Sequence, residues 1–163
     1  LDTPVSFAGG EFLKTNSEKY STRGKNKGGG LDYTLLTLQG VPEADYGELN
    51  PTRLDANIYD EMNFIQHPAG RPKEIGYWEN DDHASRCDIH TVSMTYGSAY
   101  PNSQIGYACD SEGGSSGSAI TRASDGKVIG LHHYGGVDDG LNSATMMSFI
   151  CADAGILLEC DND

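Results

Sequence analysis

The chain has 163 residues, a formal net charge of -13 and 37% hydrophobic residues, so it is long enough to bury a core and suggests one domain or little more. The negative charge argues against nucleic acid and anionic membranes as partners, because both would be repelled, and it favours cationic peptides. No run reaches the roughly 18 to 20 apolar residues that a membrane-spanning helix needs.

Short apolar or alternating runs between turn residues recur along the chain, which is typical of an all-β fold. We expect strands at 6–13, 33–38, 62–67, 74–78, 89–94, 105–109, 118–123, 127–133 and 143–147. Residues 25–30 predict a flexible loop, and the polar segment 43–57 predicts a connection between two units. A short C-terminal helix is expected over 147–155.

The chain contains four cysteines, Cys87, Cys109, Cys151 and Cys160, without the close-paired spacing of a zinc site. The start Leu1-Asp2-Thr3-Pro4 is consistent with a processed N-terminus, and we expect a secreted protein. In such a chain an even cysteine count favours two disulfides, for which three pairings are possible. We favour Cys87 with Cys109 and Cys151 with Cys160.

The segment 109–120 contains a serine, Ser116, packed between glycines and followed by apolar residues. Glycines permit backbone conformations that other residues avoid and leave amide groups free to face a developing oxyanion. Such a loop can present a nucleophilic hydroxyl, although a glycine- and serine-rich run is also typical of a plain turn.

Four segments resemble the chymotrypsin-like serine proteases, especially their bacterial branch. They are the nucleophile loop Gly114-Ser115-Ser116-Gly117-Ser118-Ala119, the aspartate segment at 31–36, the segment at 64–70, and the strand at 128–136 that walls the specificity pocket. The resemblance implies a double six-stranded β-barrel, of which this chain holds the second part of barrel one and all of barrel two. It places barrel one at 1–42, the connection at 43–57, and barrel two with its terminal helix at 58–163.

The resemblance also implies a serine endopeptidase in which Ser116 attacks the peptide carbonyl and Asp32 orients the catalytic histidine. The backbone amides of Gly114 and Ser116 would form the oxyanion hole. In the family that histidine precedes the aspartate, but all five histidines here follow Asp32. A serine hydroxyl needs a nearby general base, so we expect a separate N-terminal light chain of the same precursor to supply it. The alternative is a catalytically inactive binding module.

Overlay on trypsin places Asp110 at the base of the primary pocket, which predicts cleavage after Lys or Arg in a peptide or protein substrate. Ser111 would lie at the pocket floor, and Tyr134 and Gly135 on its wall. The runner-up is a glutamyl endopeptidase, whose pocket would use His132 to meet an acidic side chain. His133 falls where trypsin-like enzymes have a serine that hydrogen-bonds the triad aspartate.

No cofactor is expected. Calcium could bind the acidic cluster at 79–83 or the pair Asp138 and Asp139, but neither forms a recognisable ligand loop. Solvated acidic turns are the favoured interpretation, and we therefore predict no metal site.

Overall fold

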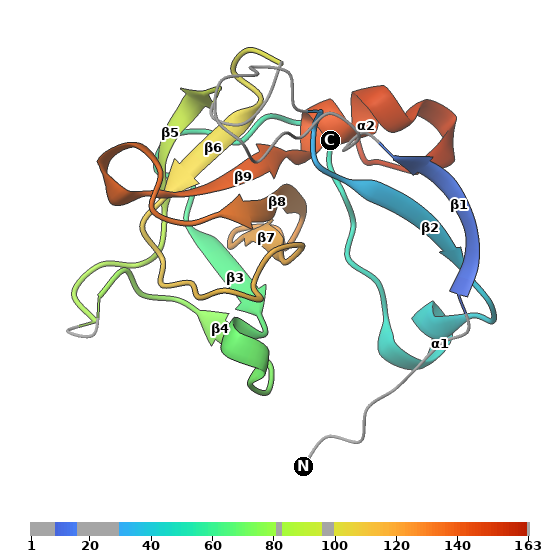
Figure 1. Ribbon diagram of the computed structural model, residues 1–163, viewed down its shortest axis with the longest axis horizontal. Helices are drawn as coiled ribbons and strands as arrows, with labels where there is room; N and C mark the ends of the chain where they lie inside the picture. Colours follow the sequence, from blue (N-terminus) through green and yellow to red (C-terminus); the bar gives the residue numbers. More distant parts are fainter. Residues whose placement is uncertain (1–8, 16–29, 81–82, 96–99, 163) are drawn as a thin grey trace.

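The computed structural model describes residues 9–15, 30–80, 83–95 and 100–162, the first of these stretches by its backbone alone. Two sheets are present in this part of the chain (Figure 1). The first pairs β1 (Gly9–Thr15) with β2 (Thr34–Leu38). The second has seven antiparallel strands in the order β4-β3-β7-β8-β9-β6-β5. Most of the described chain is therefore β-structure.

The strands of the larger sheet are short and follow the chain from residue 62 to residue 146. They are β3 (Met62–Gln66), β4 (Glu74–Gly76), β5 (Ile89–Met94), β6 (Gln104–Tyr107), β7 (Ala119–Arg122), β8 (Val128–Tyr134) and β9 (Asn142–Met146). Glu61, just before β3, forms a bridge with Asp88, just before β5. The amide of Met62 donates to the carbonyl of Cys87 over 2.9 Å, so the two ends of the sheet approach each other at this seam.

The core of the larger sheet follows from the alternation of side chains along its strands. In β3, Met62, Phe64 and Gln66 are buried, whereas Asn63 and Ile65 are only partly buried. Because successive side chains of a strand point to opposite faces, the buried set lines one face. The core on that face also contains Ile89, Ile105, Tyr107, Ile120, Ile129 and Ala144.

A second core lies where the C-terminal helix α2 (Met147–Ala154) packs against the segment that leads into β2 (Figure 1). Leu31 and Tyr33 are buried there beside Ile150 and Cys151. The hydroxyl of Tyr33 donates a 2.6 Å hydrogen bond to Asp153. This core connects the N-terminal sheet to the larger one.

The expected strands agree with the structure within about two residues, and the helix expected over 147–155 is α2 (Met147–Ala154). The predicted start of the first strand, 6–8, and most of the loop 25–30 lie outside the described residues. The segment expected to connect the two units, 43–57, contains most of the short helix α1 (Pro42–Tyr46). Proline fits the first turn of a helix, where its missing amide proton would be unsatisfied anyway.

The pairing of the cysteines is confirmed. Cys87 is bonded to Cys109 and Cys151 to Cys160. The first disulfide joins Cys87, two residues before β5, to Cys109. Cys109 begins the loop that carries Ser116, residues 109–118, which we call the serine loop. The second ties the C-terminal tail to α2. Within the described residues, no helix is both long and apolar enough to cross a membrane.

Candidate active site

The serine loop lies between β6 and β7 and is held by a buried glutamine. Gln66 of β3 donates to the carbonyl of Asp110 over 2.9 Å and accepts a 2.7 Å hydrogen bond from the hydroxyl of Ser115. Gly114 and Gly117 have φ angles of 102° and 85°, which glycine adopts without strain. The loop therefore buries Ser115 and exposes the next residue, Ser116.

Ser116 is placed beside the end of β8. Its Oγ lies 3.4 Å from the carbonyl oxygen of His133, a long hydrogen bond. Among the described residues, no imidazole nitrogen lies within hydrogen-bond distance of this hydroxyl. The backbone amides of Gly114 and Ser116 donate to no other residue in the described ranges, so both remain available for a ligand oxygen.

Asp32 lies two residues before β2, with a φ of 56°, a left-handed conformation that aspartate tolerates better than most residues. Its position is fixed by its neighbour, because Leu31 is buried and its carbonyl accepts a 2.8 Å hydrogen bond from Thr145 Oγ1. Asp32 Oδ2 lies 3.4 Å from Nδ1 of His133. Asp32 and Ser116 thus contact the same residue, one at its ring and the other at its carbonyl.

The ring of His133 is almost fully buried, with a side chain only 6% exposed. Its Nε2 lies 2.5 Å from Oε1 of Gln104, whose amide nitrogen donates to Ser103 and Thr145. Because that assignment makes Oε1 an acceptor, Nε2 carries a proton. The other ring nitrogen, Nδ1, faces the carboxylate of Asp32.

The contact between Asp32 and Nδ1 of His133 is long, and among the described residues Nδ1 has no partner of good hydrogen-bond geometry. The imidazole nevertheless lowers the pKa of Asp32, and partial burial of the carboxylate opposes this effect. Asp32 is therefore ionised in neutral solution. A carboxylate in this state can accept a proton donor on its exposed side.

The predicted pocket residues fall into two groups. Ser111 donates a 2.8 Å hydrogen bond to Asn142, and a Cβ added to Gly135 would lie 3.0 Å from the same amide oxygen. Asn142 in turn donates to the carbonyl of Cys109. Ser111 and Gly135 are thus brought together, and Tyr134 adjoins them with its ring stacked obliquely 4.7 Å from that of His133.

Asp110 lies outside the group around Asn142, and it is exposed. Gln66 holds the backbone of Asp110 rather than its side chain, so the carboxylate is left at the surface. Asp110 instead lines an open groove of about 370 Å³ together with Gln66, Glu74, Ile75, Gly76, Tyr77, Trp78, Asn80 and His83. In the described part of the chain its carboxylate has no ion-pair partner.

His132 points into the core instead of lining an open pocket. It is 3% exposed, its Nδ1 lies 2.5 Å from the hydroxyl of Tyr107, and its ring centroid lies 4.9 Å from that of Phe64. Burial, with a smaller contribution from the charge of His133, lowers the pKa of His132 to about 4. The ring is neutral at pH 7 and inaccessible to a substrate side chain in this conformation.

This buried ring predicts an acid-sensitive fold. Because the pKa of His132 is about 4 in the folded state and 6.5 for a solvated histidine, only the unfolded chain takes up this proton as the pH falls from about 6.5 to 4. The contribution of His132 to stability is therefore present above pH 6.5 and lost below it. The loss is on the order of 3 kcal/mol across this range.

Urea denaturation at several pH values measures this effect, with His132→Asn as the variant that removes the titrating group. The slope of unfolding free energy against pH should be smaller in the variant between pH 4 and 6.5, even if the variant is less stable throughout. Parallel slopes in the two proteins would exclude His132 as the source.

Comparisons with known proteins agree with this architecture. Two crystal structures of the Rv3671c protease from M. tuberculosis superpose on the chain. The active form has a TM-score of 0.63 and 13% identity, and covers 96% of this chain and 61% of the other. The inactive form of a serine-to-alanine mutant has a TM-score of 0.61 and 14% identity. This match covers 95% of the present chain and 68% of the mutant's chain. These likenesses show a trypsin-like fold.

The family model of the trypsin-like peptidase domain matches residues 3–131, which is most of the chain. The chain therefore belongs to the trypsin-like peptidase domain family. It is also 36% identical over 106 residues to "Secreted RxLR effector protein 73" of Plasmopara viticola, covering 65% of this chain. It spans 25% of that relative's length.

Several residues of the site were not singled out from sequence. Gln66, Gln104 and Asn142 are buried polar side chains that contact the serine loop, the ring of His133 and the hydroxyl of Ser111. Gln66 could have been found, because it occupies an inward position of an alternating strand, where a polar side chain requires partners. Gln104 and Asn142 stand at strand starts and carry no such signal.

Proposed function

We propose that the chain is the C-terminal part of a secreted serine endopeptidase that becomes active when a histidine from another segment lies between Ser116 and Asp32. The observation that carries this proposal is that both residues contact His133, while its ring is turned into the buried network around Gln104. Ser116 would be the nucleophile, and Asp32 would orient the incoming imidazole and stabilise its charge.

The amides of Gly114 and Ser116 are the candidate oxyanion hole. Both are free of other acceptors in the described residues, as donors to a transient oxyanion must be. Where such donors have been removed from other enzymes, the loss is about 3 to 4 kcal/mol of transition-state stabilisation.

The exposed apolar face of the N-terminal sheet is evidence for a partner segment. Its second strand, β2, exposes Leu36 and Leu38 at about half of their surface, 49% and 51%. A two-stranded sheet with an apolar face is marginal on its own, and unpaired strand edges favour the addition of further strands. The additional strands of a first barrel, from a light chain of the same precursor, would cover this face and carry the histidine. A double β-barrel would result, with one unit at 1–42 completed by the light chain and the other, at 58–163, formed by the seven-stranded sheet.

The oxidising environment that two disulfides require and the word "Secreted" in the relative's name support an extracellular protein. The same relative is named an effector, which favours the second candidate function, an inactive peptidase-like binding module. The absence of a general base near Ser116 in the described residues fits either function. A glutamyl specificity based on His132 is disfavoured by the burial of that ring.

Peptide cleavage by the intact secreted protein distinguishes the two functions. We expect hydrolysis of a mixed peptide library that disappears in Ser116→Ala and persists in Ser118→Ala, a matched change in the same loop. Equal activity of the Ser116→Ala variant and the unmodified protein, or no hydrolysis by either, would contradict an endopeptidase.

The proposed preference for Lys or Arg rests on Asp110 in the groove beside the serine loop. Gln66 connects the two, because it hydrogen-bonds both Ser115 and the backbone of Asp110. The groove also contains Tyr77 and Trp78, but the guanidinium of Arg86 already lies over both rings, 5.1 and 5.5 Å from their centroids. The attraction for a cationic side chain therefore rests on the carboxylate of Asp110.

Substitution Asp110→Asn is expected to lower kcat/KM for Lys and Arg substrates about tenfold, as for a solvent-screened charge contact. An uncharged substrate should lose little. The control Asp45→Asn, on α1, should change neither. Stronger cleavage after Glu than after Lys or Arg would overturn this assignment of Asp110.

A further inference from the structure

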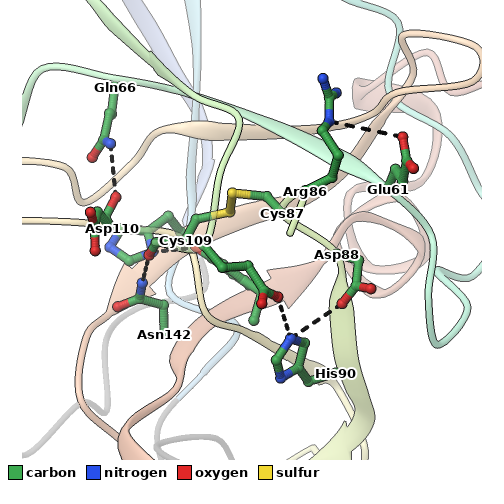
Figure 2. Close-up of a disulfide and its surroundings, with 12 residues drawn as sticks. Glu61, Gln66, Arg86, Cys87, Asp88, His90, Cys109, Asp110 and Asn142 are labelled. Atoms are coloured by element: carbon green, nitrogen blue, oxygen red, sulfur yellow. Dashed lines mark hydrogen bonds and ion pairs between the residues drawn. A yellow bond between two sulfur atoms is a disulfide. The ribbon is translucent and has the colours of Figure 1, made fainter. Parts of the chain in front are cut away.

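A cluster of one imidazole and two carboxylates lies at the seam of the larger sheet. Asp88 and His90 are two residues apart on the β5 segment, so their side chains leave the same face of the strand, as Figure 2 shows. Glu79 approaches from the opposite segment, where its amide donates to the carbonyl of Ser85 over 3.0 Å. A bridge between Trp78 and Arg86 aligns that segment with β5.

The three side chains converge on one point. Nε2 of His90 lies 2.5 Å from Glu79 Oε1 and 3.2 Å from Asp88 Oδ1, and one ligand atom from each residue lies within 4.8 Å of the others. A single ring nitrogen carries at most one proton, so it cannot satisfy both carboxylates equally well. Among the described residues, neither Glu79 nor Asp88 has a Lys or Arg partner.

We propose that Glu79, Asp88 and His90 bind one divalent cation of the zinc class. Two carboxylates and a neutral imidazole match the charge of Zn²⁺, and all three donors are common zinc ligands. In a tetrahedral site with ligand bonds of about 2.0 to 2.2 Å, ligand atoms are roughly 3.3 to 3.5 Å apart. The distance between His90 and Asp88 already fits, and the Glu79 carboxylate needs to withdraw by less than an ångström.

The donor set selects against calcium. Ca²⁺ takes about six to eight oxygen ligands, whereas this cluster offers an imidazole nitrogen and two carboxylates. The remaining position of a zinc ion would be filled by water, since all three side chains retain some solvent contact, from 15% for Glu79 to 35% for His90. All four cysteines are in disulfides, so the chain offers no thiolate as a competing zinc ligand.

A bound cation would cross-link the seam of the sheet. Asp88 is bridged to Glu61 of the β3 segment, and the neighbouring residue, Cys87, is disulfide-bonded to the serine loop (Figure 2). The ion would join the segment after β4 to β5 at the same place. Its expected role is to stabilise this part of the sheet.

Titration of the intact, tag-free protein with ZnCl₂ in a calorimeter tests the proposal. We expect one Zn²⁺ site that weakens at least about tenfold in Asp88→Asn and in His90→Gln, because even the loss of an outer-shell partner of a metal ligand costs about 10- to 100-fold in affinity. The control His67→Gln, which removes an exposed histidine outside the cluster, should bind Zn²⁺ as the unmodified protein does.

A second readout identifies the ligands directly. Zn²⁺ should protect His90 from modification by diethyl pyrocarbonate, and it should raise the melting temperature of the unmodified protein but not of Asp88→Asn. The proposal is overturned if Zn²⁺ binding is unchanged in both ligand variants, if no binding occurs, or if CaCl₂ binds the cluster while ZnCl₂ does not. Neither readout depends on peptidase activity.

Discussion

Substitution Asp32→Asn is expected to lower kcat of the proposed endopeptidase by about four orders of magnitude, as loss of the triad carboxylate does in enzymes of this mechanism. The amide would not stabilise an imidazolium between itself and Ser116, and it would favour the wrong tautomer of the neutral ring. Initial-rate kinetics on a peptide substrate measure the effect. The melting temperature, measured in parallel, reports the structural consequence of leaving His133 without its anion.

Asp45→Asn, an exposed change on α1, is the control for loss of one negative charge and should retain kcat. If kcat of Asp32→Asn falls by less than tenfold while substrate affinity is unchanged, Asp32 does not act as the triad carboxylate. This result would leave Asp32 as a structural partner of His133.

Loss of the Cys87–Cys109 disulfide is expected to have the largest effect on stability. It closes a loop of 22 residues, and the chain-entropy model gives a stabilisation of about 3 kcal/mol for a loop of this length. The double substitution of Cys87 and Cys109 by alanine should lower the free energy of unfolding by about this amount in urea denaturation. It should also loosen the serine loop, which begins at Cys109.

The Cys151–Cys160 disulfide is the internal comparison. It closes a shorter loop of 9 residues, so its removal should cost somewhat less in the same assay. A larger loss on removing Cys151 and Cys160 than on removing Cys87 and Cys109 would contradict this ranking. It would indicate that packing of α2, rather than loop length, dominates.

Much of the β-structure could be predicted from sequence, because buried strands alternate clearly. In β3, Met62, Phe64 and Gln66 alternate with Asn63 and Ile65, and the turns between strands are marked by glycine. Over 74–94 the predicted strands differ from the observed ones only at one strand end. The strand expected at 74–78 ends at Gly76, and the chain returns to the ladder only at isolated positions such as Trp78.

The candidate site was predicted less completely, because its parts come from distant segments. The glycine positions marked the loop around Ser116, and the resemblance marked Asp32. The strand containing His132 and His133 is one residue longer than the related motif, so its register could not be fixed by counting. The structure shows that His132 enters the core and that His133 faces Asp32.

Long-range side-chain contacts explain the remaining differences. Asp110 is exposed because Gln66, 44 residues away in the sequence, hydrogen-bonds its backbone carbonyl and not its carboxylate. The Glu79, Asp88 and His90 cluster depends on the bridge between Trp78 and Arg86, which brings the two segments together. The acidic composition of 79–83 was visible in the sequence, but the ligand set that forms there was not.

Labelling of Ser116 by diisopropyl fluorophosphate, located by peptide mass spectrometry, tests most directly whether a histidine from another segment activates this serine. The prediction is a single adduct on Ser116 in the complete secreted protein and none in the isolated 163-residue chain, with circular dichroism confirming that the chain is folded. An unlabelled Ser116 in the complete protein, or equal labelling in both, would contradict the proposal.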